Sequence, residues 1–91
     1  MAEFAGLDGR VAFVTGGASG IGAAVCRLLV GAGTRVAIAD YNLDGAKELA
    51  EELASKGHDC VAVKVDVSDL ASVRAAIGVT TDRFGALHLT G

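Results

Sequence analysis

The chain has 91 residues, the length of one domain, and a net charge of −3. Hydrophobic residues make up 52% of it and charged residues 21%, a balance that argues against a disordered chain. Lys and Arg form no run and aromatic residues are few, which disfavours a nucleic-acid partner, and no stretch reaches the ~20 continuous apolar residues of a membrane span.

The first predicted elements are a strand and a helix. Residues 11–14 form a short apolar run, as in a strand buried on both faces. The helix starts at Ile21, and its apolar residues recur with helical spacing, so we expect them to face the core. They are Ile21, Ala24, Val25, Leu28 and Ala32. Gly31 and Gly33 are natural stops for this helix.

A second strand and helix follow in the same order. Residues 36–39 predict a buried strand that ends at Asp40. The inner face of the next helix should comprise Leu43, Ala46, Leu49, Ala50 and Leu53. Gly57 suits its C-terminal end, and residues 60–65 predict a third strand that leads into Asp66 and Val67.

A third helix and the start of a fourth strand complete the chain. Ser68 is the expected N-cap, with Asp69 in the first turn. The predicted inner face comprises Leu70, Val73, Ile77, Thr81 and Phe84. Gly85 ends this helix, and residues 86–89 predict the fourth strand.

This β-α-β-α-β-α-β order predicts an α/β fold, a Rossmann-type doubly wound parallel sheet. Right-handed crossovers give strand order 3-2-1-4, truncated after about four strands. We expect residues 86–89 to lie at an edge, where Val11, Phe13 and Leu87 would expose apolar surface.

The segment between the first strand and first helix reads Thr-Gly-Gly-Ala-Ser-Gly-Ile-Gly over residues 15–22. Its glycines Gly16, Gly20 and Gly22 let the backbone turn tightly and approach a phosphate, and the following helix N-terminus favours an anion. The pattern predicts a loop that holds a dinucleotide pyrophosphate. Glycines in tight turns also serve packing alone. No Gly-Lys-Ser/Thr follows, which excludes a P-loop phosphotransferase.

Acidic residues end the second and third strands on the same predicted edge. Asp40 lies 18 residues beyond Gly22, where a carboxylate can accept both hydroxyls of an adenosine ribose, or can act as a capping or surface acid. Asp66 either faces a ligand bound at this edge or caps the third helix together with Ser68. Tyr41 either stacks against the adenine edge or packs as a half-exposed side chain.

Cys26 and Cys60 lack metal-ligand spacing. We expect reduced, buried or half-buried thiols, as in a cytoplasmic protein, and no metal site. The N-terminus carries Glu3 and no basic segment typical of a signal peptide, which agrees with a cytoplasmic location.

Taken together, Thr-Gly-x-x-x-Gly-Ile-Gly, the Asp that ends the second strand and Asp-Val after the third strand resemble the N-terminal half of a short-chain dehydrogenase/reductase. Residues 84–88, Phe-Gly-Ala-Leu-His, match the family's lead into its fourth strand, and the resemblance covers about residues 7–89. It implies an oxidoreductase that transfers hydride between NAD(H) and an alcohol or carbonyl substrate, as a homo-oligomer.

The resemblance also implies roles for particular residues. The three glycines shape the cofactor loop, Thr15 helps to fix it, Asp40 binds the adenosine ribose, and Asp66 and Val67 flank the adenine. The implied cofactor-binding residues are Gly16, Ser19, Gly20, Ile21, Gly22, Asp40, Tyr41, Asp66 and Val67.

The family's catalytic residues have no counterpart in these 91 residues. Its Asn-Asn-Ala-Gly segment, serine and Tyr-x-x-x-Lys pair would follow the fourth strand, and Tyr41 is followed four positions later by Gly45. We therefore assign no catalytic residue, interpret residues 1–91 as the NAD-binding N-terminal part of one Rossmann domain, and expect this chain alone to be inactive. The alternative is a stand-alone nucleotide-binding or interaction module without chemistry.

Overall fold

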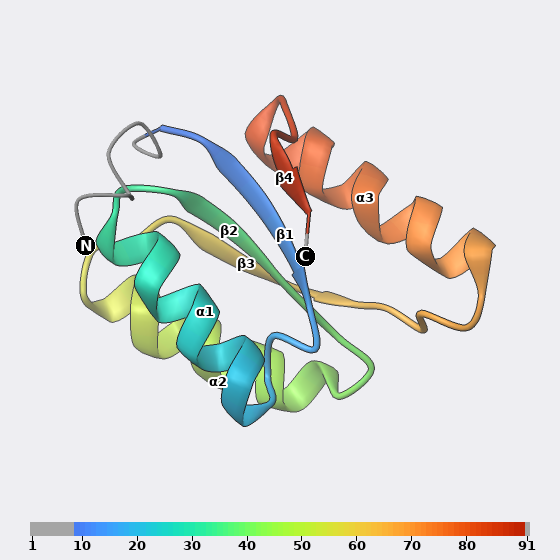
Figure 1. Cartoon of the computed structure of the whole chain (residues 1–91), viewed down its shortest axis with the longest axis horizontal. Helices are drawn as coiled ribbons and strands as arrows, with labels where there is room; N and C mark the ends of the chain where they lie inside the picture. Colours follow the sequence, from blue (N-terminus) through green and yellow to red (C-terminus); the bar gives the residue numbers. More distant parts are fainter. Residues whose placement is uncertain (1–8, 91) are drawn as a thin grey trace.

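The computed structural model describes residues 9–90, which form a parallel sheet with helices on both faces (Figure 1). The strands are β1 (Val11–Thr15), β2 (Arg35–Asp40), β3 (Cys60–Lys64) and β4 (Leu89–Thr90), in the order β3-β2-β1-β4. The helices are α1 (Gly20–Gly31), α2 (Leu43–Ser55) and α3 (Leu70–Phe84). The α/β fold class predicted from the sequence is thus observed. In this described part of the chain, no helix has the length and apolarity needed to cross a membrane.

Strands β1 and β2 are buried on both faces, and their successive residues belong to two separate hydrophobic clusters. Ala12 and Val14 of β1 pack with α1 and α2, whereas Val11 and Phe13 pack with α3 on the opposite face. This division accounts for the continuous apolar runs of β1 and β2, because every position in them faces a helix layer.

The fourth strand begins later than predicted and leaves less apolar surface exposed. It starts at Leu89 rather than Ala86 and pairs with β1 over two residues. Val11 is fully buried and Phe13 is 2% exposed, so the expectation that they expose apolar surface is wrong. The reason is that α3 covers this face through Ala76 and Phe84, with Leu87 packed against the same cluster.

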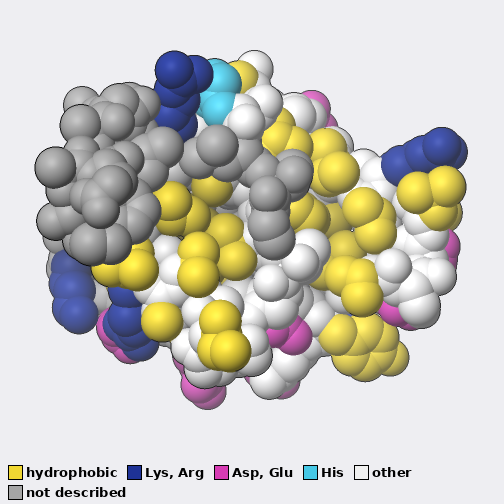
Figure 2. Space-filling model, in the orientation of Figure 1, with side chains coloured by type: hydrophobic (Ala, Val, Ile, Leu, Met, Phe, Trp, Pro, Cys, Tyr) yellow, Lys and Arg dark blue, Asp and Glu magenta, His cyan; other side chains and the backbone are white. Residues whose placement is uncertain are grey.

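Helix α1 presents a different face to the core from the one predicted. Cys26 and Val30 are buried, whereas Ile21 is 84% exposed and Leu28 is 52% exposed. Both sets have helical spacing, so the spacing alone could not choose between them. Figure 2 shows hydrophobic side chains spread over one face of the molecule.

Helix α2 follows the prediction more closely. Ala46, Leu49 and Leu53 are buried against the sheet, as the spacing indicated. Asn42 is the N-cap, and its side chain accepts a hydrogen bond from the Gly45 backbone N–H at 3.1 Å.

Helix α3 differs from the prediction at its start and on its inner face. The N-cap is Asp69 rather than Ser68, because the Asp69 carboxylate accepts hydrogen bonds from two backbone N–H groups of the first turn. Thr80 is fully buried and its hydroxyl donates to the Ala76 carbonyl oxygen, whereas Leu70 is 62% exposed. Gly85 ends the helix in the left-handed region at φ +81°, as predicted.

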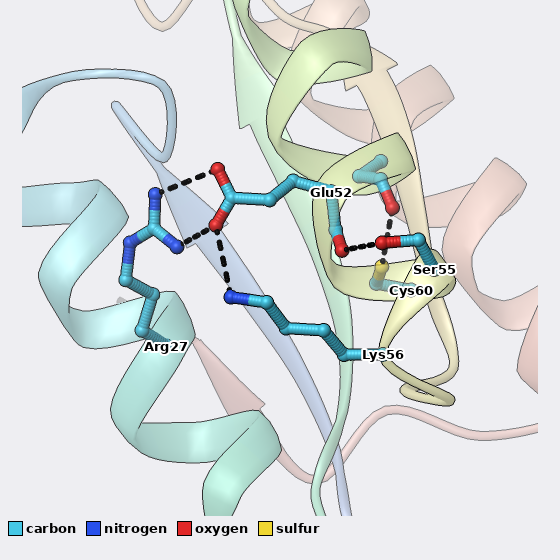
Figure 3. A network of polar contacts seen from close by, with 6 residues as sticks. Arg27, Glu52, Ser55, Lys56 and Cys60 are labelled. Atoms are coloured by element: carbon cyan, nitrogen blue, oxygen red, sulfur yellow. Dashed lines mark hydrogen bonds and ion pairs between the residues drawn. The ribbon is translucent and has the colours of Figure 1, made fainter.

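An exposed ion-pair network ties α1 to α2 (Figure 3). The Arg27 guanidinium donates to both carboxylate oxygens of Glu52, with Nη2 and Oε1 3.1 Å apart, and the Lys56 ammonium lies 3.5 Å from Oε2. The Arg27 guanidinium holds the pKa of the Glu52 carboxyl below its usual range. Exposed pairs of this kind contribute little stability.

Candidate nucleotide-binding site

The predicted site residues gather at the edge of the sheet where the parallel strands end. β1 ends at Thr15, β2 at Asp40 and β3 at Lys64, and the loop from β1 to α1 lies at this edge. The ends of β2 and β3 are joined by a hydrogen bond from the Val65 N–H to the Asp40 carbonyl oxygen, at 3.1 Å. Ligands of open α/β sheets bind at this edge.

The loop after β1 is a tight turn closed by its own hydrogen bonds. Gly16 has φ +66°, in the left-handed region that favours glycine. Its carbonyl oxygen accepts from the Ser19 N–H at 3.0 Å and from the Ser19 hydroxyl at 2.6 Å. The Gly17 N–H donates to the Ala39 carbonyl oxygen at 3.1 Å, which attaches the turn to β2.

Two glycines of the loop are required by the fold itself. A Cβ on Gly22 would stand 1.9 Å from the Gly16 carbonyl oxygen, closer than any real contact. A Cβ on Gly17 would stand 2.8 Å from Cγ2 of Ile38. Gly17 was not among the site residues predicted from the sequence. Its adjacency to Gly16 was the only local signal, and its constraint comes from a side chain of β2.

Gly20 differs because a Cβ there would meet nothing within 4 Å. It is the first residue of α1, and it is exposed. Ser19 is the N-cap, yet its side chain makes no capping hydrogen bond. The Ser19 side chain therefore leaves the first backbone N–H groups of α1 uncapped, and a helix N-terminus of this kind favours an external anion.

Asp40 connects the loop to the end of β2 through both carboxylate oxygens. Oδ2 accepts from the Ala18 N–H at 2.9 Å, and Oδ1 accepts from the Asn42 N–H at 2.9 Å. A carboxylate offers about four acceptor positions, so capacity remains for hydroxyl donors. Asp40 is not a helix cap, because Asn42 caps α2.

Tyr41 follows Asp40 and is 68% exposed. The Lys64 ammonium lies 5.1 Å from the centroid of its ring. Both residues line a cavity of about 510 Å³ at the N-terminal end of α2, together with Asn42, Leu43 and Asp44. Lys64 was not predicted as a site residue, because it belongs to no local sequence motif.

Asp66 and Val67 stand just after β3. Asp66 Oδ1 accepts from the Ser68 hydroxyl at 2.6 Å and from the Ser68 N–H at 3.0 Å. Both hydrogen bonds hold the pKa of the Asp66 carboxyl below its usual range, and the bond from the Ser68 hydroxyl has the larger effect. The alternative in which Asp66 and Ser68 cap α3 is wrong, because Asp69 takes that role. Val67 is 68% exposed beside this acid.

Comparison with known proteins agrees with this geometry. The family model described as short chain dehydrogenase matches residues 10–89. A D-threitol dehydrogenase of Mycolicibacterium smegmatis is 43% identical over 88 residues, covering 91% of this chain and 32% of the relative. A 2,5-dichloro-2,5-cyclohexadiene-1,4-diol dehydrogenase of Sphingobium indicum is 41% identical over 81 residues, covering 89% of this chain and 32% of the relative.

Solved structures show the same arrangement. A short chain dehydrogenase/reductase from Burkholderia phymatum, in complex with NAD, superposes with a TM-score of 0.89 at 31% identity and covers 92% of this chain and 30% of that one. A hydroxysteroid dehydrogenase from Escherichia coli superposes with a TM-score of 0.91 at 24% identity, which shows the shared fold, and covers 99% of this chain and 38% of that one. The chain therefore spans about a third of the length of the relatives it matches.

Proposed function

The chain belongs to the short-chain dehydrogenase family, and we propose that its residues 1–91 are the NAD-binding N-terminal part of one Rossmann domain. The observation that carries the proposal is the open backbone at Gly20, at the start of α1 and two residues after Ala18, whose N–H donates to the carboxylate that ends β2. A nucleotide pyrophosphate fits where a Cβ would otherwise stand, with the first N–H groups of α1 as donors.

In this proposal each predicted site residue has one task. Gly16 and Gly22 shape the turn, Ser19, Gly20 and Ile21 lie beside the pyrophosphate, and Asp40 accepts the ribose hydroxyls. Tyr41 lies beside the adenosine, and Asp66 and Val67 flank the adenine. The bound nicotinamide would supply the hydride chemistry, and these residues bind and orient the cofactor.

The whole protein would transfer hydride between NAD(H) and an alcohol or carbonyl substrate. Its relatives include dehydrogenases named for diols and for a sugar alcohol, which supports this reaction class. The stand-alone module is not favoured, because the family match runs through residues 10–89. A homo-oligomer in the cytoplasm completes the proposal, and the free thiols of Cys26 and Cys60 fit that location.

We further propose that the site prefers NAD(H) to NADP(H). The Asp40 carboxylate would meet the additional 2′-phosphate at close range and repel it. No Arg or Lys lies in residues 16–19 to compensate, and the Lys64 ammonium lies over the Tyr41 ring. We expect a preference of about ten-fold or more, since charge pairs near a protein surface are worth a few kcal/mol at most.

Calorimetric titration of the chain with the two cofactors tests this. Asp40→Ala should narrow the difference between them, whereas Asp82→Ala, an exposed acid on α3, should leave it unchanged. Equal or tighter binding of NADP(H) by the unaltered chain would contradict the preference. If neither NAD(H) nor NADP(H) binds to the chain, the proposed function is contradicted.

A further inference from the structure

Lys64 stands in register with Asp40 on the neighbouring strand. Side chains that are in register on adjacent parallel strands project from the same face of the sheet. The ammonium of Lys64 reaches the ring of Tyr41, 5.1 Å from its centroid. Asp40, Tyr41 and Lys64 thus form one corner of the candidate site, where β2 and β3 end.

The contact between Lys64 and Tyr41 matters because the tyrosine is otherwise poorly held. Its side chain is 68% exposed and lines the cavity of about 510 Å³. No carboxylate among residues 9–90 lies within ion-pair distance of the Lys64 ammonium, although Asp44 lines the same cavity. The contact that the structure gives this exposed ammonium is therefore with the ring rather than with a neighbouring acid.

We propose that Lys64 is a positioning residue, which holds the Tyr41 ring at the wall of this cavity and so raises the affinity for the adenosine half of the cofactor. This inference rests on the proposed function. A cation over an exposed aromatic ring restricts it by a modest energy. A ring that is already oriented loses less conformational entropy when a ligand binds. Because the cation lies over one ring face, the other face is left for a planar base.

A simpler role for Lys64 would be as a charge that discourages pairing at β3, an edge strand of the described sheet. That role requires only the charge and makes no use of Tyr41. The two roles therefore differ in whether the effect of Lys64 passes through the tyrosine, which a double-mutant cycle measures.

The ligand-free chain allows a first test by fluorescence. Tyr41 is the sole tyrosine and the chain has no tryptophan, so its intrinsic fluorescence reports on this ring. Lys64→Met should lower the anisotropy and increase quenching by acrylamide. Lys64→Arg, which keeps a cation, should resemble the unaltered chain, as should Lys47→Met, an exposed lysine of α2 outside this cavity. No change in Lys64→Met overturns the inference.

The second test is the calorimetric affinity for NAD⁺. Lys64→Met should weaken binding by about two- to five-fold, the range expected of an exposed cation–π contact. In a Tyr41→Ala background the same substitution should have no further effect. An equal loss in both backgrounds, or no loss at all, overturns the inference. If the unaltered chain does not bind NAD⁺, the proposed function fails, while the fluorescence result still decides whether Lys64 holds Tyr41.

Discussion

Gly20 and Gly22 lie two positions apart in the loop, and the structure separates their roles. Gly22 has no room for a side chain against the Gly16 carbonyl, whereas Gly20 has open space. The first is therefore a requirement of folding. At Gly20, by contrast, nothing in the protein itself excludes a side chain, as expected of a position that is kept open for a ligand.

We expect Gly20→Val and Gly22→Val to fail in different ways. Gly20→Val should change the free energy of unfolding by less than about 0.5 kcal/mol and weaken NAD⁺ binding at least about ten-fold, because the branched side chain would occupy the phosphate position. Gly22→Val should destabilise the fold by about 3 kcal/mol through its backbone clash. Thermal melting and calorimetry separate the two quantities. A Gly20→Val chain that kept its affinity would show that this glycine serves no ligand.

At the scale of residues, the sequence could predict those roles that depend on neighbours along the chain. The spacing of Gly16, Gly20 and Gly22 indicated the loop, and Asp40 was placed by the strand that it ends. The roles of Gly17 and Lys64 could not be predicted, because the residues that they contact lie on other segments of the chain. The Ile38 side chain leaves no room for a side chain at Gly17. The pairing of β2 with β3 brings Lys64 close to the ring of Tyr41.

At the scale of elements, the start of α3 and the inner face of α1 show a second limit of sequence reasoning. Ser68 and Asp69 are both good N-caps, and the choice depended on Ser68 donating to Asp66 instead. In α1, one i, i+4 pair is buried at Cys26 and Val30 while another, Ile21 and Val25, is exposed. Periodicity identified the helix but did not set its rotation.

Burial of Cys26 predicts a change of stability in alkaline solution. Desolvation is the main cause that raises the pKa of this thiol from 9.0 to about 11, and Cys26 is fully buried. A folded-state pKa above the unfolded value gives stability that is complete below about pH 9 and is lost as the pH rises toward 11. The loss should reach about 2 kcal/mol.

Urea unfolding at several pH values between about 8 and 11 measures this effect. In Cys26→Ala the free energy of unfolding should fall by about 2 kcal/mol less over this pH range than in the unaltered chain. The variant should be less stable at every pH, because a cavity remains. Cys60 is kept in both chains, and its charge is the second cause that raises the pKa of Cys26. Parallel declines in the two chains would show that the buried thiol does not contribute.

The connection between β1 and β4 depends on a reciprocal pair of hydrogen bonds. The Val11 backbone N–H donates to the ring Nδ1 of His88 at 3.0 Å. The His88 backbone N–H donates in return to the Val11 carbonyl oxygen at 2.9 Å. Val11 is fully buried, so its N–H needs an acceptor. Since β4 pairs with β1 over two residues, this imidazole anchors the start of the strand.

Replacing the imidazole should therefore separate shape from hydrogen bonding. His88→Leu should cost about 1–3 kcal/mol, because it leaves the Val11 amide buried without an acceptor. His88→Asn keeps an acceptor and should cost less. Denaturant unfolding gives both values, and hydrogen exchange at the Val11 amide should be faster in His88→Leu alone. Equal stability of the two variants would mean that the bond adds nothing.

On the scale of the whole molecule, the sequence was sufficient for the topology. Strand order follows from helices between parallel strands and from the hand of the crossovers, which leave few alternatives. The extent of β4 was less predictable. Leu87 belongs to the core beneath α3, and pairing with β1 begins only at Leu89. An apolar run cannot distinguish these two uses of a residue.

The last prediction concerns what these 91 residues can do without the family's catalytic pair. Tyr41 is the sole tyrosine, and the residue four positions later is Gly45 rather than a lysine. Its ring lies against Lys64 at the end of β2, where we propose that the adenosine half of the cofactor binds. Binding and turnover should therefore be separable in this chain.

We expect the 91-residue chain to bind NAD⁺ and to reduce none of it. Loss of a general acid alone typically costs about 10²–10⁴-fold in rate. The nicotinamide half of the site would also need residues outside the loop between β1 and α1. The measurement is NADH absorbance with mass-verified chain and a panel of secondary alcohols and polyols, with a full-length relative such as the D-threitol dehydrogenase as a positive control. Reproducible turnover by the chain would mean that a proton donor other than tyrosine acts in it, and the site would have to be reassigned around that group.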